Sequence, residues 1–230
     1  MTARRVAIIP ARGGSKRLPR KNILPVNGQP IISYPIAAAR ASNLFDEVLV
    51  STEDSEIAEI AAHFGAKIVS RPAEYARDQS SVVDVCNHVL ESESYSDVTE
   101  FCCIYATALF LCSEQIVAAY ALFSNSTSTD CVMGVSSYNY HPVQAMKKEG
   151  DYLVSMWPEY EQLKSQDYPE LVVSNGSLYW CCRAAFQEQQ TFYTRNLQGY
   201  KLNSIDIDTD ADYQAAIELA ERYSPGRDIL

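Results

Sequence analysis

The sequence predicts an α/β fold in which helices cover both faces of a mainly parallel sheet. Short apolar runs of strand length alternate with longer stretches whose apolar residues recur at helical spacing. This alternation is typical of parallel strands that are joined by right-handed helical crossovers. With 230 residues, of which 47% are hydrophobic, the chain is long enough to bury the core of one such domain. We therefore expect a single domain over residues 1–230.

The first half of the chain repeats a strand followed by a helix three times. The expected strands are RRVAIIP, EVLVST and AKIVS, at residues 4–10, 47–52 and 66–70. The expected helices cover residues 30–42, 54–65 and 80–93. Pro35 indicates a kink or a first-turn position in the first helix. In the second helix, Asp54 or Ser55 can cap the start and Gly65 can end it.

The second half continues the pattern but contains a long interruption. The expected strands cover residues 100–108, 130–138, 176–182 and 202–208, and the expected helices cover residues 113–124 and 210–223. Between residues 138 and 174 the alternation breaks. Residues 141–156 resemble a hairpin that turns at Glu149-Gly150-Asp151, and an irregular, aromatic and polar stretch follows. We predict that residues 138–174 form an inserted arm or lid, used for substrate binding or dimerisation.

Composition argues against several classes of function. The net charge of -10 opposes a general nucleic-acid binding role. No run approaches the roughly 20 apolar residues that a membrane span needs, and the first apolar run is too short for a signal peptide. The seven cysteines are odd in number, contain no C-x-x-C motif and lie mostly in apolar runs. Free cysteines of this kind behave as small hydrophobic residues, so we expect a cytoplasmic protein.

A basic loop, residues 11–22, follows the first predicted strand. It holds five of the nineteen Lys and Arg residues of the chain, together with Gly13 and Gly14. Ligands of open α/β sheets gather at the carboxyl ends of strands, and adjacent glycines let backbone N–H groups approach an anion. The sequence therefore predicts a triphosphate site here, against the alternative of a solvated basic turn. Neither G-x-x-x-x-G-K-[ST] nor G-x-G-x-x-G is present.

Asp206 and Asp208 alternate along the last predicted strand, which places both on one face. Two neighbouring carboxylates repel each other unless a cation lies between them, and Mg²⁺ prefers oxygen ligands. We predict that this pair binds Mg²⁺. The alternative is a strand end followed by a helix cap at Thr209 or Asp210, which leaves Asp206 without a role.

Several motifs together resemble one enzyme family. They are IPARGGSKRLPRKNI, GQPIISYPIAAARAS, FDEVLVSTEDSEIAEIAAHFGA, RPAEYARD, FCCIYATALFL and IDIDTDADY. In this order and spacing they resemble the cytidylyltransferases that activate sialic acid and related nonulosonic acids. The stretches CCIYATA, HPVQAM and SQD are most similar to the pseudaminic acid branch. In contrast, Ser174-Asn175-Gly176 looks more like the sialic and legionaminic relatives.

The resemblance implies a nucleotide-diphospho-sugar transferase (Rossmann-like) fold and the transfer of CMP from CTP to the anomeric hydroxyl of a nonulosonic acid. It assigns catalysis to Lys21, Arg12, Asp206 and Asp208, with the two aspartates as the Mg²⁺ ligands. The implied nucleotide-binding residues are Ala11, Arg12, Gly13, Lys16, Lys21, Asn22 and Arg71. Without the resemblance, Arg71 reads as a surface arginine at a strand end.

By the same resemblance, the sugar acid lies across the second half of the site. The implied sugar-binding residues are Tyr105, Thr107, His141, Gln144, Gln166, Asp167 and Asn175. His141 precedes Pro142 in a turn, and the alternative to ligand contact is that this histidine has a purely structural role. The acceptor alternatives are legionaminic and sialic acid, and a non-catalytic nucleotide-sugar binding protein is the alternative of a different class. The family also implies a homodimer formed through residues 138–167.

Overall fold

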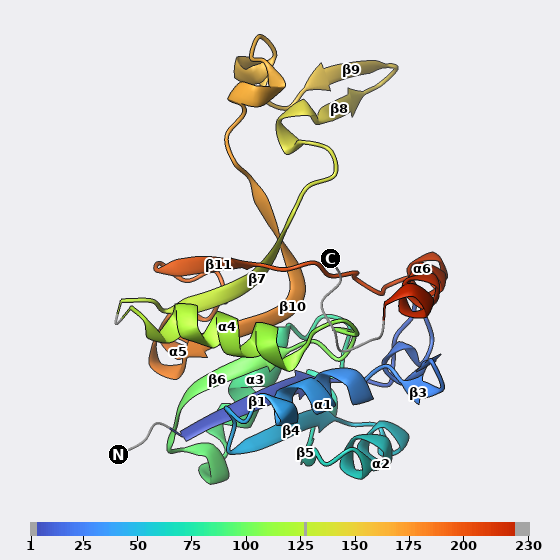
Figure 1. Cartoon of the computed structure of the whole chain (residues 1–230), viewed down its shortest axis with the longest axis vertical. Helices are drawn as coiled ribbons and strands as arrows, with labels where there is room; N and C mark the ends of the chain where they lie inside the picture. Colours follow the sequence, from blue (N-terminus) through green and yellow to red (C-terminus); the bar gives the residue numbers. More distant parts are fainter. Residues whose placement is uncertain (1–3, 127, 224–230) are drawn as a thin grey trace.

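A seven-stranded sheet forms the centre of the computed structural model, which describes residues 4–126 and 128–223 (Figure 1). The strands lie in the order β11-β7-β10-β6-β1-β4-β5. Their bounds are β1 Arg4–Pro10, β4 Glu47–Thr52, β5 Lys67–Ser70, β6 Val98–Ile104, β7 Cys131–Ser137, β10 Val172–Cys182 and β11 Leu197–Lys201. The strand β10 runs antiparallel to both of its neighbours, and every other pairing is parallel. The predicted mainly parallel α/β sheet is confirmed.

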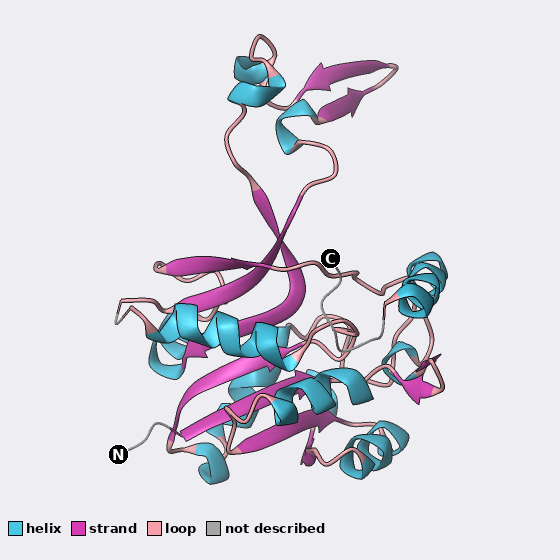
Figure 2. Ribbon diagram, in the orientation of Figure 1, coloured by secondary structure: helices cyan, strands magenta, loops and turns pink. Residues whose placement is uncertain are grey.

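Helices cover both faces of this sheet (Figure 2). On one face lie α1 (Ser33–Ala41), α2 (Ser55–His63) and α4 (Ser113–Ser124), and on the other lie α3 (Val82–Glu91) and α5 (Arg183–Gln189). Successive strand residues point to opposite faces. Accordingly Ile9 packs into the first of these cores and Ile8 into the second, and both are fully buried.

A third, smaller core lies beside the sheet. It joins the last helix, α6 (Asp210–Arg222), to the two-stranded ribbon of β2 (Pro25–Val26) and β3 (Gln29–Pro30). Ile207, just before α6, is fully buried in this core. The packing fixes residues 206–208 relative to the basic loop, because Leu18 of that loop belongs to the same core.

Two predicted strands differ from the structure. The strand expected over residues 100–108 ends at Ile104, and the chain then turns, with the Ala108 N–H donating to the Tyr105 carbonyl. Residues 202–208 lie outside the regular strands, and the sheet edge is formed by β11 instead. The polar residues of LQGYK hide this edge strand from periodicity analysis, because such a strand is only half-buried.

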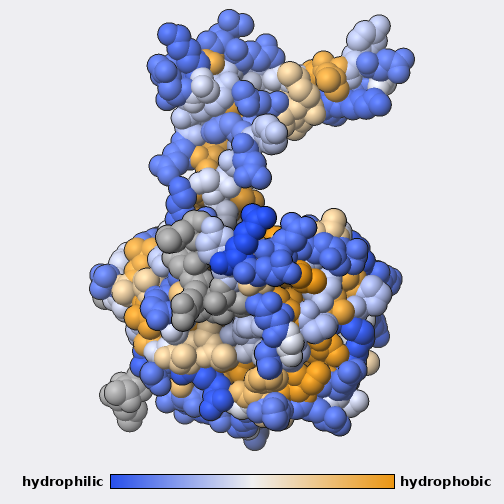
Figure 3. All heavy atoms as spheres, turned by 45° about the vertical axis from the view of Figure 1, so that its right-hand side comes forward, coloured by the Kyte–Doolittle hydropathy of each residue, from blue (hydrophilic) through white to orange (hydrophobic). Residues whose placement is uncertain are grey.

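Residues 138–174 leave the sheet after β7 and return to it in β10 (Figure 1). We call the projecting part, residues 138–171, the arm. It contains the hairpin of β8 (Met146–Glu149) and β9 (Tyr152–Ser155) and three short 3-10 helices, Pro142–Gln144, Pro158–Tyr160 and Ser165–Asp167. Figure 3 shows apolar patches on the arm among hydrophilic side chains. Across residues 4–126 and 128–223, none of the helices is long and apolar enough to span a bilayer.

Candidate active site

A cleft opens where the strand order reverses. β1 pairs with β4 on one side and with β6 on the other, and such a reversal leaves a crevice at the carboxyl ends of the strands. Residues from the basic loop, from the segment 71–85 and from the turn after β6 line this cleft. They are Pro10, Arg12, Lys21, Asn22, Arg71, Tyr75, Arg77, Asp78, Ser80, Ser81, Val82, Val85, Tyr105, Ala106 and Thr107.

The basic loop is held by hydrogen bonds to its backbone at both ends. The Ala11 N–H donates to the Ser51 carbonyl at 3.0 Å, which extends the contact between β1 and β4. The Asn22 side chain is buried and donates to the Arg12 carbonyl at 2.9 Å. Asn22 therefore closes the loop on itself and lines the cleft from a fixed position.

Acidic side chains pair with all five cations of this loop, and Asp78 and Asp208 hold two cations each. Asp78 contacts Arg12, at 3.0 Å, and Lys16. Asp208 contacts Lys21 at 2.8 Å and Arg17 at 2.5 Å. The hydrogen bond from Lys16 and the charge of both cations lower the pKa of Asp78. Of these four cations, Arg12 and Lys21 line the cleft, where an incoming anion can take over their contacts, and Lys16 and Arg17 do not line it.

Arg71 lies at the floor of the cleft with only 3% of its side chain exposed. Its guanidinium donates to the carbonyl and the hydroxyl of Ser51, and Glu53 lies 4.0 Å away. Burial lowers the pKa of Arg71, and the charge of Glu53 opposes that shift. Such a buried, fixed guanidinium is unlike the surface arginine that the strand-end position alone suggests.

The two aspartates flank the fully buried Ile207, and the charge of Asp208 acts on Asp206. The strand predicted over residues 202–208 is not formed. Asp206 is accessible to water, but the surrounding protein removes part of its hydration. This desolvation and the nearby charge of Asp208 raise the pKa of Asp206. Burial alone would raise the pKa of Asp208. The hydrogen bond and the charge of Lys21, together with the charge of Arg17, outweigh that effect and lower the pKa.

Helix α6 begins directly after this pair. Thr209 caps it, and the Asp212 side chain accepts hydrogen bonds from the Thr209 and Asp208 N–H groups. The capping alternative therefore accounts for Thr209 and leaves Asp206 and Asp208 available. Within the described residues, no group of three or more His, Cys, Asp or Glu side chains is arranged to hold a metal ion.

The predicted sugar-binding residues do not all come together in one chain. Tyr105 and Thr107 line the cleft, and burial raises the pKa of Tyr105. Asn175 is not among the residues that line the cleft, and its side-chain amide contacts Ser136, Leu202 and Ser177. His141, Gln144, Gln166 and Asp167 lie on the arm, which projects away from the sheet (Figure 1).

Most of the cleft residues that lie close to Arg71 in the chain were not predicted from the sequence. They are Tyr75, Arg77, Asp78, Ser80, Ser81, Val82 and Val85. The sequence did contain a signal for these cleft residues. The stretch RPAEYARDQSS, which contains all of them except Val82 and Val85, connects a predicted strand to a predicted helix, as the basic loop does. Ser81 caps α3 and so brings the first turn of that helix to the cleft.

Comparison with known proteins agrees with this geometry. The family model described as "Cytidylyltransferase" matches residues 6–227. The chain is 34% identical over 226 residues to a Campylobacter jejuni protein named pseudaminic acid cytidylyltransferase, covering 92% of this chain and 94% of that one. It is 30% identical to an Escherichia coli N-acylneuraminate cytidylyltransferase, covering 96% of this chain and 53% of that one. The chain thus spans about half the length of some curated relatives and nearly all of others.

Solved structures show the same fold. A CMP:2-keto-3-deoxy-manno-octonic acid synthetase complexed with CTP matches with a TM-score of 0.73 at 17% identity, covering 96% of this chain and 99% of that one. A 4-diphosphocytidyl-2C-methyl-D-erythritol synthase from Anaerococcus prevotii matches with a TM-score of 0.66 at 12% identity, covering 96% and 99%. The fold, the cleft and the matched family model agree, and the chain belongs to the cytidylyltransferase family.

Proposed function

We propose that this chain transfers CMP from CTP to the anomeric hydroxyl of a nonulosonic acid, with pseudaminic acid as the acceptor. The anomeric oxygen bonds to the α-phosphorus, the bond from that phosphorus to the β-phosphate oxygen breaks, and pyrophosphate leaves. The hydroxyl proton passes to solvent. The observation that carries the proposal is the meeting of the basic loop with Asp206 and Asp208 beside the cleft at the ends of β1 and β6.

The nucleotide lies across the cleft from Arg71 to the basic loop. Arg71 and the segment beside it hold the cytosine end, where a fixed donor can pair with exocyclic groups of a pyrimidine. The triphosphate lies along the backbone of Ala11 and Gly13 and against the cations Arg12, Lys16 and Lys21. These cations exchange their contacts with Asp78 and Asp208 for contacts with phosphate oxygens. Phosphoryl transfer depends mainly on such positioning and charge neutralisation.

A divalent cation fits the pair Asp206 and Asp208. The charge of Asp208 disfavours the ionised form of Asp206, and in the described part of the chain no side chain forms an ion pair with Asp206. Mg²⁺ is commonly held by one or two carboxylates together with substrate phosphates, so a pair of aspartates suffices. The bound ion would neutralise charge on the phosphate oxygens. The protein Rv0371C of Mycobacterium tuberculosis, which has a related fold, was solved in complex with manganese.

The acceptor lies beyond Tyr105 and Thr107. Pseudaminic acid is favoured because two relatives of that name are 33–34% identical and are matched over 94% of their length. Gly176 belongs to the stretch that favours sialic or legionaminic acid instead. Its φ of 69° and its place against the Tyr105 ring give this glycine a backbone and packing role, which weakens its value as evidence on the acceptor.

The arm supplies the remaining sugar contacts in a cytoplasmic homodimer. Its residues His141, Gln144, Gln166 and Asp167 belong to a segment that projects away from the sheet (Figure 1), so we propose that they complete the cleft of a partner copy. Exposed apolar side chains on the arm favour burial against another protein surface. They include Tyr152, Leu153, Val154, Met156 and Trp157.

Pyrophosphate release tests the proposal. The purified chain is incubated with CTP, Mg²⁺ and one acid at a time: pseudaminic, legionaminic or N-acetylneuraminic acid. We expect kcat/KM with pseudaminic acid to exceed that with the other two by at least about tenfold, because misplaced hydroxyl groups leave buried partners unpaired. Equal turnover of sialic acid would remove the acceptor assignment alone. Equal use of ATP, or no release with any acid, would contradict the cytidylyltransferase activity.

A further inference from the structure

Arg20 differs from the other four cations of the basic loop in its partners, which are Asp54 and Glu56. Like Lys16 and Arg17, and unlike its neighbours Lys21 and Asn22, it does not line the cleft. Its two terminal nitrogens donate to both carboxylate oxygens of Asp54, at 2.5 and 3.1 Å, and one of them also contacts Glu56. The guanidinium is therefore committed to the start of α2 on the outer side of the loop.

Asp54 is a rigid partner. One carboxylate oxygen caps α2 by accepting from the Ile57 N–H at 3.0 Å. The hydrogen bond from Arg20, followed by the backbone hydrogen bond from Ile57, lowers the pKa of Asp54, so the carboxylate stays charged at neutral pH. A bidentate contact to a carboxylate fixed in this way is geometrically more specific than an ordinary surface ion pair.

Gly13, near the amino end of the basic loop, also lies close to Asp54. A methyl group added to Gly13 would lie 2.4 Å from an Asp54 oxygen, so only glycine allows this approach. The Gly13 N–H donates to the Glu53 side chain at 2.8 Å. Residues 53 and 54 thus hold the loop at Gly13 and at Arg20, which directly adjoin the cleft-lining residues Arg12 and Lys21.

The backbone at Arg20 is also unusual. It adopts the left-handed conformation, with φ 60° and ψ 20°, immediately before the 3-10 helix Lys21–Ile23. For a residue other than glycine this conformation is sterically unfavourable, so surrounding contacts must maintain it. The chain direction at Arg20 determines where the Lys21 side chain points, and the ion pair with Asp54 holds that direction.

We propose that Arg20 and Asp54 form a latch that positions the basic loop for CTP, which makes Arg20 a positioning residue and not a phosphate ligand. This inference rests on the proposed function for its nucleotide. When the latch is removed, fewer molecules hold Lys21 and Asn22 in the binding conformation. The apparent Kd for CTP then rises in inverse proportion to the fraction of molecules that remain binding-competent.

The test is a double-mutant cycle on CTP binding, measured by calorimetry on the full chain. Arg20→Ala and Asp54→Asn are made singly and together. Asn remains a good N-cap, so Asp54→Asn removes the ion pair while keeping α2 capped. Each single variant is expected to weaken CTP binding by about tenfold, and the double variant by the same tenfold, because both changes break one latch.

Two controls separate positioning from stability and from direct phosphate binding. Arg195→Ala breaks a comparable exposed pair with Glu188 outside the cleft, at 2.8 Å, and is expected to leave the Kd for CTP unchanged. Arg20→Lys keeps the charge but cannot hold both oxygens, so only partial rescue is expected. Full rescue by lysine, or a double variant weakened by about a hundredfold, would show that Arg20 binds phosphate independently and would overturn the latch.

Failure of the latch and failure of the proposed function give different results. A wild-type chain that does not bind CTP contradicts the proposed function. Wild-type binding of CTP with single variants that bind equally well overturns the latch alone. Unfolding temperatures of all variants are measured alongside, and a Kd that changes without a matching loss of stability supports the latch.

Discussion

Lys21 lies 2.8 Å from the Asp208 carboxylate and also contacts the Ile207 carbonyl, at the lip of the cleft. At the residue scale it is the side chain best placed to meet the proposed triphosphate and the proposed metal-binding pair together. We predict that Lys21→Ala lowers kcat by on the order of 10²–10³, because one well-placed cation near developing charge supplies that much. The measurement is pyrophosphate release at saturating CTP.

A matched control uses Lys201, a basic residue of β11 outside the cleft. Lys201→Ala is expected to retain wild-type kcat. Circular dichroism and the unfolding temperature report whether Lys21→Ala folds. A folded Lys21→Ala protein with undiminished pyrophosphate release would remove Lys21 from the mechanism.

The two aspartates are expected to differ from each other. Activity should disappear in excess chelator, and Asp206→Asn and Asp208→Asn should each raise the Mg²⁺ concentration needed for half-maximal rate, because an amide is a poorer ligand than a carboxylate. Asp208 also holds Lys21 and Arg17. Asp208→Asn should therefore lower the rate even at saturating Mg²⁺. In contrast, Asp206→Asn should regain the wild-type rate when Mg²⁺ is saturating. Full activity in chelator would refute the metal assignment.

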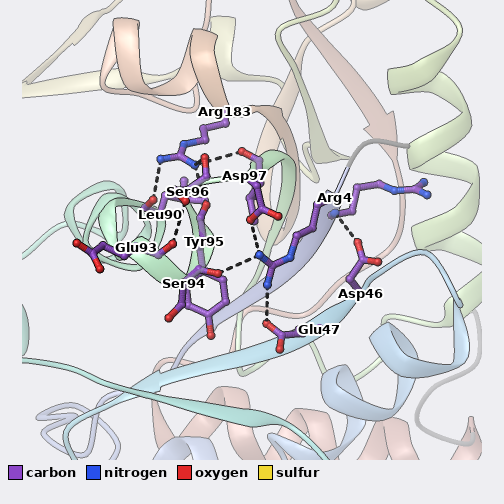
Figure 4. A network of polar contacts seen from close by, with 12 residues as sticks. Arg4, Asp46, Glu47, Leu90, Glu93, Ser94, Tyr95, Ser96, Asp97 and Arg183 are labelled. Carbon is purple, nitrogen blue, oxygen red and sulfur yellow. Dashed lines mark hydrogen bonds and ion pairs between the residues drawn. The ribbon is translucent and has the colours of Figure 1, made fainter. Parts of the chain in front are cut away.

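At the scale of elements, Arg183 joins four segments at the amino end of the sheet (Figure 4). Its guanidinium donates to the carbonyls of Leu90, Tyr95, Ser96 and Val98, at 2.7–3.2 Å. These contacts connect the start of α5 to the end of α3 and to β6. Figure 4 also shows Arg4 contacting Asp97 and Glu47 beside this network.

We predict that Arg183→Ala lowers the free energy of unfolding by about 2 kcal/mol, since it leaves several carbonyls without a charged donor. For a chain of this size the unfolding temperature should then fall by roughly 4–8 °C. Arg183→Lys should give a smaller loss, because an ammonium group cannot reach all four carbonyls. CTP binding should be unchanged, since this network lies away from the cleft. A wild-type unfolding temperature would contradict the prediction.

At the scale of the whole molecule, a cleft completed by the arm of a partner copy can be tested by complementation. Lys21→Ala disables the cleft, and a Gln166→Ala, Asp167→Ala protein disables the arm. In a mixed dimer, one site combines an intact cleft with an intact arm. Random pairing places half of the protein in such dimers, so co-expression should restore about one quarter of wild-type activity.

The alternative outcomes are distinct. If each arm serves its own cleft, the mixture shows no more activity than the average of the two variants alone. If the chain is a monomer, sedimentation gives a mass near 25.7 kDa and no restoration occurs. Either result would remove the proposed dimer with shared sites.

Periodicity predicted most of the sheet and helices because their apolar faces are continuous. Val6, Ile8 and Ile9 of β1 are all fully buried, and such runs identify a strand without further information. The half-buried β11 and the short α5 have no such signal. The basic loop was predicted as an anion site from its glycines and cations, and the structure places Arg12, Lys21 and Asn22 on the cleft wall.

By itself, the sequence determined the fold class, the family and the chemical character of the site, because these depend on local patterns that neighbouring residues share. Only the tertiary structure decided which charged groups meet. Asp78 reaches Arg12 from 66 residues away, and Asp208 reaches Lys21 from 187 residues away. It also decided that Arg20 turns to Asp54 and that the arm projects away from the sheet (Figure 1). Such pairings depend on how the strands and loops pack in three dimensions, which no local pattern of residues records.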